Sequence, residues 1–135
     1  PGGAAPITVV RGLDNRSAGL RIPVSGPGAR RVENRLPGSD SNPYLAIAAS
    51  LASGYLGMKN HLQPRPAVAG NAYRNAHQLP RGLLEALLEF EDSKDLHDIL
   101  GHRFSHVYMQ MKRSEFEEFM RVISPWEREH LLLSV

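Results

Sequence analysis

The stretch NRSAGLRIPVSGPGARRVENRLPGSDSNP, residues 15–43, decides the fold of this 135-residue chain. Apolar side chains alternate with other residues over residues 20–24 and again over residues 32–36, and the sequence SGPG separates the two runs. Alternation with a period of two is typical of strands, and glycine and proline between two strands indicate a hairpin or a short loop. The stretch therefore predicts a pair of antiparallel strands within residues 11–37. An apolar run, ITVV at residues 7–10, predicts a short strand before it.

Arginines cluster around a carboxylate in this stretch. The arginines are Arg16, Arg21, Arg30, Arg31 and Arg35, and the carboxylate is Glu33. Alternate residues of a strand share a face, so Arg31, Glu33 and Arg35 are expected to project together, with the carboxylate between two guanidinium groups. By the same parity, Arg30 points to the opposite face and is given a structural role.

Such a face has two interpretations. Guanidinium groups match phosphate and carboxylate oxygens with two parallel hydrogen bonds, and a carboxylate among them can hold a divalent cation. Phosphoryl transfer needs both kinds of group, because positive charge must meet the transferred phosphoryl and acidic ligands must fix the metal. The pattern alone also allows a salt-bridged strand face, in which Glu33 only neutralises its neighbours.

Charge and composition narrow the classes of partner. The formal net charge is only +2, and residues 11–35 carry six arginines against two acidic residues. A local basic patch in an otherwise balanced chain suits a small anionic ligand better than a nucleic acid, which would need a longer basic stripe. An arginine-rich RNA-binding module would also need aromatic side chains for base stacking, and residues 11–35 contain none. We therefore expect no nucleic-acid partner.

Compartment signals are few. The chain contains no cysteine, no apolar run that approaches the ~20 residues of a membrane span, and no visible signal peptide. These features predict a cytoplasmic protein with no membrane partner. The chain begins at Pro1 without an initiator methionine, and we interpret it as a piece of a longer protein.

Most of the remaining chain predicts helices. Asn42 is a suitable N-cap and Pro43 suits a first turn, and apolar residues then recur at helical spacing to about Lys59. Further helices are expected at residues 83–91, 93–101 and 102–123, with a capping box, SPWE, at residues 124–127. The fold class is therefore α/β (α+β): a short antiparallel strand pair followed by a mainly helical C-terminal half.

Three motifs carry a resemblance to a known family. NRSAGLRIP at residues 15–23, ARRVENR at 29–35 and NPYLAIAA at 42–49 resemble, in order and spacing, the C-terminal part of the glutamine synthetase catalytic domain. The resemblance covers residues 1–135 and corresponds to about the last third of a typical family member. It implies that the N-terminal domain and the first part of the catalytic domain are absent from this sequence.

Within the family, the chain is most similar to γ-glutamyl-polyamine (γ-glutamylputrescine) synthetases. Four sequence segments carry this similarity: ARRVENRLPG at residues 29–38, SNPYLAIAASLASGYLG at 41–57, GNAY at 70–73 and SPWEREHLLLSV at 124–135. The resemblance implies an ATP-dependent ligase that joins L-glutamate to a small amine, such as putrescine, through γ-glutamyl phosphate. It implies Mg²⁺ or Mn²⁺ as the metal.

The resemblance also assigns roles to five residues. Arg16 would face the phosphoryl group during transfer, and Arg21 and Arg31 would contact the ATP phosphates. Glu33 would ligate one of the active-site divalent metals. Arg35 would hold the glutamate side chain.

Two positions depart from the pattern of ammonia-using relatives. Gly28 stands where those relatives carry a lysine, so one nucleotide contact is lost or supplied elsewhere. Ala4 stands where they carry a flap-loop glutamate that closes over the ammonium site. Loss of that carboxylate removes a charge that would hold ammonium and leaves room for a bulkier amine.

The C-terminal end, LLLSV at residues 131–135, is an apolar tail, and we expect it to pack against a partner surface. The resemblance implies that this segment reaches into a neighbouring subunit and ties two hexameric rings into a dodecamer. The alternative is that the tail packs on its own subunit.

Two other functions stay open, an ammonia-using glutamine synthetase and a non-catalytic assembly domain. The 135-residue piece alone is expected to be inactive.

Overall fold

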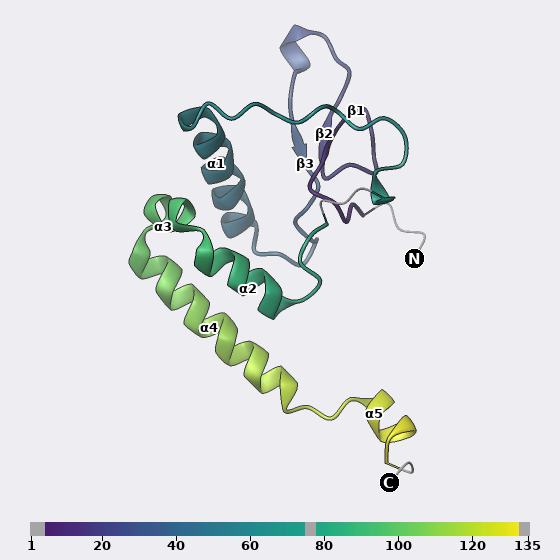
Figure 1. The fold of residues 1–135 in the computed structure, drawn as a ribbon, viewed down its shortest axis with the longest axis vertical. Helices are drawn as coiled ribbons and strands as arrows, with labels where there is room; N and C mark the ends of the chain where they lie inside the picture. Colours follow the sequence, from purple (N-terminus) through teal and green to yellow (C-terminus); the bar gives the residue numbers. More distant parts are fainter. Residues whose placement is uncertain (1–4, 75–77, 133–135) are drawn as a thin grey trace. The chain divides into compact units, whose positions relative to one another are not determined.

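A computed structural model describes residues 5–74 and 78–132 of the chain. The chain divides into two compact units, Pro1–Leu79 and Pro80–Val135. The first unit contains a small sheet and one long helix, and the second is helical (Figure 1). This is the α/β (α+β) arrangement that the sequence predicts, with a mainly helical C-terminal half.

The sheet of the first unit has three short strands, β1 (Arg11–Leu13), β2 (Leu20–Ile22) and β3 (Glu33–Asn34), in the order β1-β2-β3. The antiparallel pairing of β2 with β3 confirms the predicted strand pair, although both strands are shorter than the alternating runs. Leu20 lies opposite Asn34 and Arg21 opposite Glu33.

Strand β1 is parallel to β2, and the sequence did not predict this pairing. The strand expected at residues 7–10 is wrong in its bounds, since the regular strand begins at Arg11 and Thr8 forms only an isolated bridge with Gln78. Parallel strands are ordinarily joined by about a dozen or more residues, whereas residues 14–19 join β1 to β2 directly. This compact loop therefore needs support from elsewhere in the chain.

The core of the first unit is built from small residues. Val10, Ala18 and Ala72 form a buried cluster, and Val68 packs against it. Gly19 lies where two neighbouring segments pass very close, because a Cβ atom there would be 2.5 Å from Leu36 Cδ2 and 2.5 Å from the Thr8 carbonyl oxygen. The absence of a side chain at Gly19 thus lets β2 begin against its neighbours.

Helix α1 (Pro43–Lys59) begins and ends where the sequence predicts. The Asn42 side chain accepts hydrogen bonds from the Tyr44 and Leu45 backbone N–H groups, and Pro43 occupies the first turn. A side-chain hydrogen bond joins α1 to β3, in which Asn34 Nδ2 donates to Ser50 Oγ at 2.8 Å.

One face of α1 is apolar and exposed. It is formed by Tyr44, Ile47, Leu51, Tyr55 and Met58, and each of these side chains is more than half exposed. Their spacing of three or four residues places them along one side of the helix. Among the described residues, Ala52 is the only position of α1 in the buried class.

Residues 80–132, the described part of the second unit, form four helices: α2 (Leu83–Asp92), α3 (Lys94–Leu100), α4 (His102–Met120) and α5 (Pro125–His130). Leu87 of α2 and Met109 of α4 are buried, and the Phe90 and Tyr108 rings meet edge to face. Helix α4 ends three residues before the predicted boundary. The predicted capping box is confirmed, since Ser124 and Glu127 each bond the other's backbone N–H at 3.1 and 2.7 Å. No helix in the described part of the chain has the length and apolarity to cross a bilayer.

The close approach at Gly19 gives a stability prediction. Gly19→Ala is expected to lower the free energy of unfolding of the chain by about 1–3 kcal/mol, because the added methyl group overpacks against Leu36 and the Thr8 carbonyl group. The matched control is Gly26→Ala, where a Cβ atom would meet nothing within 4 Å. Urea unfolding measures both variants, and equal stabilities would show that the segments around Gly19 are not in close contact.

Candidate functional site

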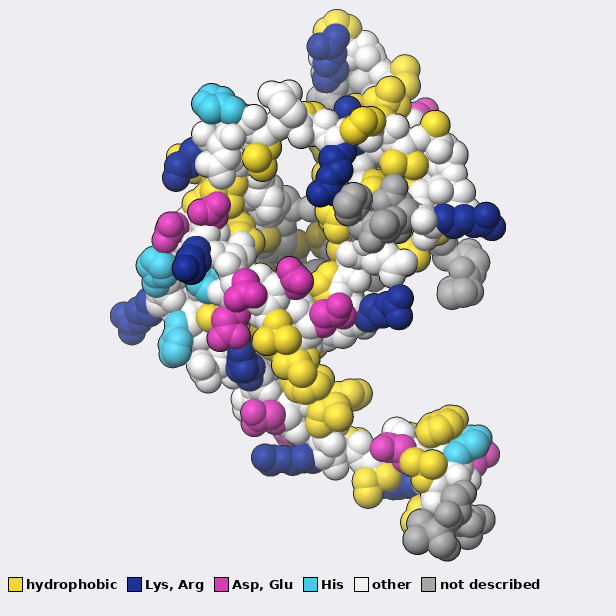
Figure 2. Space-filling model, viewed as in Figure 1, with side chains coloured by type: hydrophobic (Ala, Val, Ile, Leu, Met, Phe, Trp, Pro, Cys, Tyr) yellow, Lys and Arg dark blue, Asp and Glu magenta, His cyan; other side chains and the backbone are white. Residues whose placement is uncertain are grey.

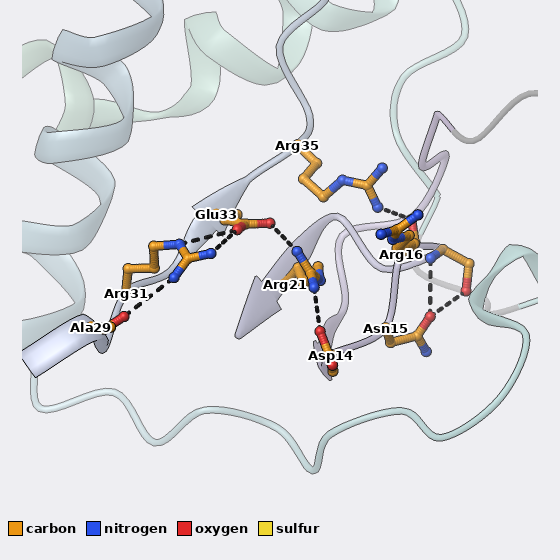
Figure 3. Close-up of polar contacts among 9 residues, drawn as sticks. Asp14, Asn15, Arg16, Arg21, Ala29, Arg31, Glu33 and Arg35 are labelled. Atoms are coloured by element: carbon orange, nitrogen blue, oxygen red, sulfur yellow. Dashed lines mark hydrogen bonds and ion pairs between the residues drawn. The ribbon is translucent and has the colours of Figure 1, made fainter. Parts of the chain in front are cut away.

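Four charged side chains form a continuous ladder on the sheet, in the order Asp14, Arg21, Glu33, Arg31 (Figure 3). Arg21 Nη1 donates to Glu33 Oε2 at 2.8 Å, and Arg21 Nη2 donates to Asp14 Oδ1. The other oxygen of Glu33 accepts from Arg31 Nε at 3.1 Å and from Arg31 Nη2 at 3.0 Å. Both oxygens of the carboxylate are therefore bonded to guanidinium groups.

The strand register explains the centre of this ladder. Arg21 and Glu33 are directly opposite each other on β2 and β3, so their side chains leave the sheet on the same face. Arg31 precedes Glu33 by two residues and reaches the same carboxylate. The expectation that Glu33 lies between two guanidinium groups is confirmed, but its second partner is Arg21 and not Arg35.

Partial burial strengthens the central pair. The side chains of Arg21 and Glu33 are 19% and 29% exposed, whereas those of Asp14 and Arg31 are each 53% exposed. The hydrogen bond from Arg21, followed by that from Arg31, holds the pKa of Glu33 below its usual value, although partial burial opposes this. The bond to Glu33, followed by that to Asp14, raises the pKa of Arg21. Both groups are therefore charged at neutral pH.

Arg16 lies in the loop between β1 and β2, and its two neighbours anchor that loop. Asn15 Nδ2 donates to the Val68 carbonyl oxygen at 3.1 Å and to that of Gly70 at 2.8 Å. Asn15 Oδ1 accepts from the Ser17 backbone N–H at 3.0 Å and from Ser17 Oγ at 2.7 Å. The residues on both sides of Arg16 are thus tied into place.

A strap formed by residues 65–72 completes this anchoring. The Ala72 N–H donates to Ser17 Oγ at 2.9 Å, and the buried Thr8 hydroxyl donates to the Ala72 carbonyl oxygen at 3.1 Å. At the other end, Arg11 Nε donates to the Arg65 carbonyl oxygen at 2.6 Å. Sequence reasoning missed these contacts because most of the acceptors are backbone carbonyl groups, which have no side-chain signature.

Arg35 extends the site towards Arg16. Its backbone N–H donates to the Gly19 carbonyl oxygen at 2.9 Å, and its Nη1 donates to the backbone carbonyl oxygen of Arg16. Figure 3 shows both arginines in the same region as the charge ladder. The structure therefore gathers Arg16, Arg21, Arg31, Glu33 and Arg35 on one part of the first unit, while their individual roles stay predictions.

The remaining sequence expectations have different outcomes. Ala4 lies outside the described residues. Gly28 lies in a short 3-10 turn, Pro27–Ala29, where a Cβ atom would meet nothing within 4 Å. A longer side chain at that position would have room, so the glycine is not required by packing.

The described residues do not form a complete metal site. No group of three or more His, Cys, Asp or Glu side chains is close enough to hold an ion in residues 5–74 and 78–132. Glu33 has the oxygen chemistry that Mg²⁺ and Mn²⁺ prefer, but both oxygens are paired with guanidinium groups. Among the described residues, Glu33 could therefore supply one carboxylate to a metal, but it does not form a complete site.

Comparison with known proteins identifies the family. The family model described as "Glutamine synthetase, catalytic domain" matches residues 1–131. The chain belongs to this family. The charge ladder and the loop that carries Arg16 lie within the matched residues.

Three curated relatives differ in the ligase that they represent. A glutamate–isopropylamine ligase of Pseudomonas sp. is 42% identical over 86% of the chain and 26% of its own length. The glutamine synthetase of Methanosarcina mazei is 36% identical over 94% of the chain and 30% of its own length. The γ-glutamylputrescine synthetase PuuA of Escherichia coli is 38% identical over 98% and 28%. The chain thus spans about a quarter to a third of the length of these relatives.

A solved structure supports the fold assignment. The chain superposes on apo GmaS without ligand with a TM-score of 0.84 and 33% identity, over 97% of this chain and 31% of that chain. The small sheet of the first unit and the helices of the second are therefore elements of a glutamine synthetase-type fold.

The charge ladder gives a prediction for pH. Arg21→Gln is expected to raise the pKa of Glu33 towards its ordinary value of 4.5, because the largest cause of the lowered pKa is removed. NMR titration of the Glu33 carboxyl carbon measures this change. The matched control is Arg30→Gln, which removes an arginine of the opposite strand parity.

The sign of the stability effect follows from the same pair. Because the pKa of Glu33 is lowered by folding, its contribution to stability is present above the unfolded value near 4.5 and is lost as the pH falls through the folded value. The acid-induced loss of stability should therefore be smaller in Arg21→Gln than in the parent chain. An unchanged Glu33 pKa in Arg21→Gln would contradict the central ion pair.

Proposed function

We propose that this chain is the C-terminal part of an ATP-dependent ligase that joins L-glutamate to an amine through γ-glutamyl phosphate. The observation that carries the proposal is the half-buried Glu33 carboxylate, shared by Arg21 and Arg31 beside a second pair of arginines. Guanidinium forks bind phosphate and carboxylate oxygens, and a carboxylate among them can turn to a divalent cation. Family membership supports this chemistry.

The proposed reaction has two steps. An oxygen of the glutamate γ-carboxylate attacks the terminal phosphorus of ATP, the bond to the ADP oxygen breaks, and γ-glutamyl phosphate forms. The amine nitrogen then attacks the acyl carbon, and the carbon–oxygen bond to phosphate breaks. The attacking nitrogen loses a proton to a base outside this chain. Bound Mg²⁺ or Mn²⁺ supplies neutralisation of the phosphate charge.

The residues of this chain would act as binding and orienting groups. Arg21 and Arg31 would donate hydrogen bonds to ATP phosphate oxygens, and Glu33 would give one oxygen to the metal. Arg16 would stabilise the charge of the phosphoryl group in transfer, and Arg35 would bind the glutamate side chain. The anchoring of Asn15 and Ser17 would keep Arg16 in place throughout the reaction.

The acceptor that we propose is a small alkylamine or polyamine, such as putrescine. Similarity to a glutamate–isopropylamine ligase and to PuuA supports an amine larger than ammonium, as does alanine at position 4. An ammonia-using glutamine synthetase is the second candidate, supported by the similarity to the enzyme of Methanosarcina mazei. We place the intact enzyme in the cytoplasm.

Phosphate release measured with several different amines tests this proposal. The full-length parent enzyme is expected to release phosphate from ATP in the presence of glutamate and putrescine or isopropylamine, with little release in the presence of ammonium. Glu33→Gln should lower the rate by about 100-fold or more, because one metal-binding oxygen loses its charge. The matched control, Glu89→Gln on the exposed surface of α2, should leave the rate unchanged.

Each outcome of this measurement is informative. Turnover with ammonium alone would identify an ordinary glutamine synthetase. No turnover with any amine would favour a non-catalytic assembly domain. Measurable ligation by the 135-residue chain alone would contradict the view that the upstream segment supplies the other ligands and most of the substrate pocket.

We also propose that the C-terminal segment holds together a homo-oligomer, a dodecamer of two hexameric rings. Large apolar side chains of residues 119–132 are at least half exposed, namely Phe119, Met120, Val122, Ile123, Trp126, Leu131 and Leu132. Hydrophobic side chains are open to the surface in the C-terminal part of the chain (Figure 2). A patch of this kind is typical of an interface. The last residues of the tail, 133–135, lie outside the described residues.

Removal of residues 122–135 from the full-length parent tests the assembly role. The truncated enzyme is expected to sediment with about half the mass of the parent, because the rings would separate while each ring stays intact. Analytical ultracentrifugation gives the mass directly, with Glu129→Gln as the control on the same helix. A truncated enzyme that keeps the full mass would place the ring-to-ring contact elsewhere.

A further inference from the structure

Asp14 is the end of the charge ladder that the proposed chemistry leaves without a role. It follows β1 directly and has a φ of +47°, in the left-handed region that few residues other than glycine adopt. Its backbone N–H donates to the Ile22 carbonyl oxygen at 2.9 Å, and its carboxylate accepts from Arg21 Nη2. Asp14 is therefore hydrogen-bonded to two successive residues of β2, to Ile22 through its backbone and to Arg21 through its side chain.

The turn alone does not account for an aspartate. Asparagine and glycine adopt the left-handed conformation at least as readily, and the backbone hydrogen bond to Ile22 needs no side chain. What aspartate adds is a negative charge on the outer edge of the Arg21 guanidinium. Arg21 is consequently held from two sides, through Nη1 by Glu33 and through Nη2 by Asp14.

The two carboxylates differ in what they are free to do. Glu33 sits between Arg21 and Arg31, and in the proposed function it gives an oxygen to a divalent cation. When it does so, Arg21 loses a partner while its side chain stays only 19% exposed. A half-buried guanidinium with no carboxylate partner is costly, because water cannot fully replace the lost bonds. A second carboxylate on the opposite edge removes much of that cost.

We propose that Asp14 is a positioning residue for Arg21, which keeps the guanidinium in place when Glu33 turns to a divalent cation. The inference rests on the proposed function of Glu33. Asp14 binds the same guanidinium group through its other terminal nitrogen, so Arg21 keeps a carboxylate partner when Glu33 releases it, and this lowers the cost of metal binding. It would also keep Arg21 oriented for a phosphate oxygen, instead of free to rotate away.

The variant that isolates this role is Asp14→Asn in the full-length parent enzyme. Asparagine has nearly the same shape and tolerates the left-handed backbone, so the turn is retained and only the charge is lost. Binding of Mn²⁺ without nucleotide, measured by electron paramagnetic resonance, is expected to weaken by about threefold to tenfold. Asp40→Asn, in the exposed turn after β3, is the matched control and should leave Mn²⁺ binding unchanged.

A double-mutant cycle separates positioning from simple charge. If Asp14 acts through Arg21, Asp14→Asn should have almost no effect on Mn²⁺ binding in an Arg21→Gln background. If Asp14 merely attracts the cation over a distance, the two effects on binding should be independent, and the proposal is overturned. An unchanged Mn²⁺ affinity in Asp14→Asn with intact Arg21 overturns it as well.

Glu33→Gln distinguishes failure of this inference from failure of the proposed function. The Mn²⁺ site must be lost in Glu33→Gln if Glu33 is a ligand. A site that survives this change contradicts both the proposed role of Glu33 and the inference built on it. A site that depends on Glu33 but not on Asp14 contradicts the inference alone.

Discussion

The ion pair between Arg21 and Glu33 is the interaction on which the rest of the first unit depends. It joins β2 to β3 at 2.8 Å, and it exists because the antiparallel register places these two residues opposite each other. A slip of one residue would move Arg21 to the other face of the sheet and leave Glu33 with Arg31 alone. The strands are short, so a specific pair of charges contributes to register where few backbone bonds are available.

The loop that carries Arg16 is also held by a small number of specific contacts. Six residues, 14–19, join two parallel strands, and the strap at residues 65–72 holds them by hydrogen bonds from residues more than fifty positions away. Gly19 and the alanines of the core permit the segments to approach closely enough for these bonds to form. Hydrogen bonds therefore fix the loop around Arg16, even though few large side chains are buried among the described residues of this unit.

The sequence predicted those parts of the fold that local patterns specify. Alternation identified the β2–β3 pair, and Asn42 with Pro43 identified the start of α1, because capping and strand periodicity involve neighbours in the chain. The parallel pairing of β1 could not be predicted, since RGL shows no alternation and its partner is set by the turn at Asp14.

The candidate site was predicted in its residues more than in its contacts. Parity placed Arg31 beside Glu33, but the choice between Arg21 and Arg35 as the second partner required the register of two strands. The sequence could place apolar residues along α1 and the C-terminal segment, but only the structure shows that these faces are exposed. Surfaces of this kind are typical of contacts with further protein.

A structure of the full-length parent with Mg²⁺ and ADP would show whether the charge ladder is a nucleotide and metal site. We expect one Glu33 oxygen at about 2.1 Å from the metal, Arg21 still bonded to Asp14, and a phosphate oxygen within hydrogen-bond distance of Arg21 or Arg31. A structure in which Glu33 keeps both guanidinium partners while the nucleotide and metal lie elsewhere would contradict this expectation. The ladder would then be a salt-bridged strand face and nothing more.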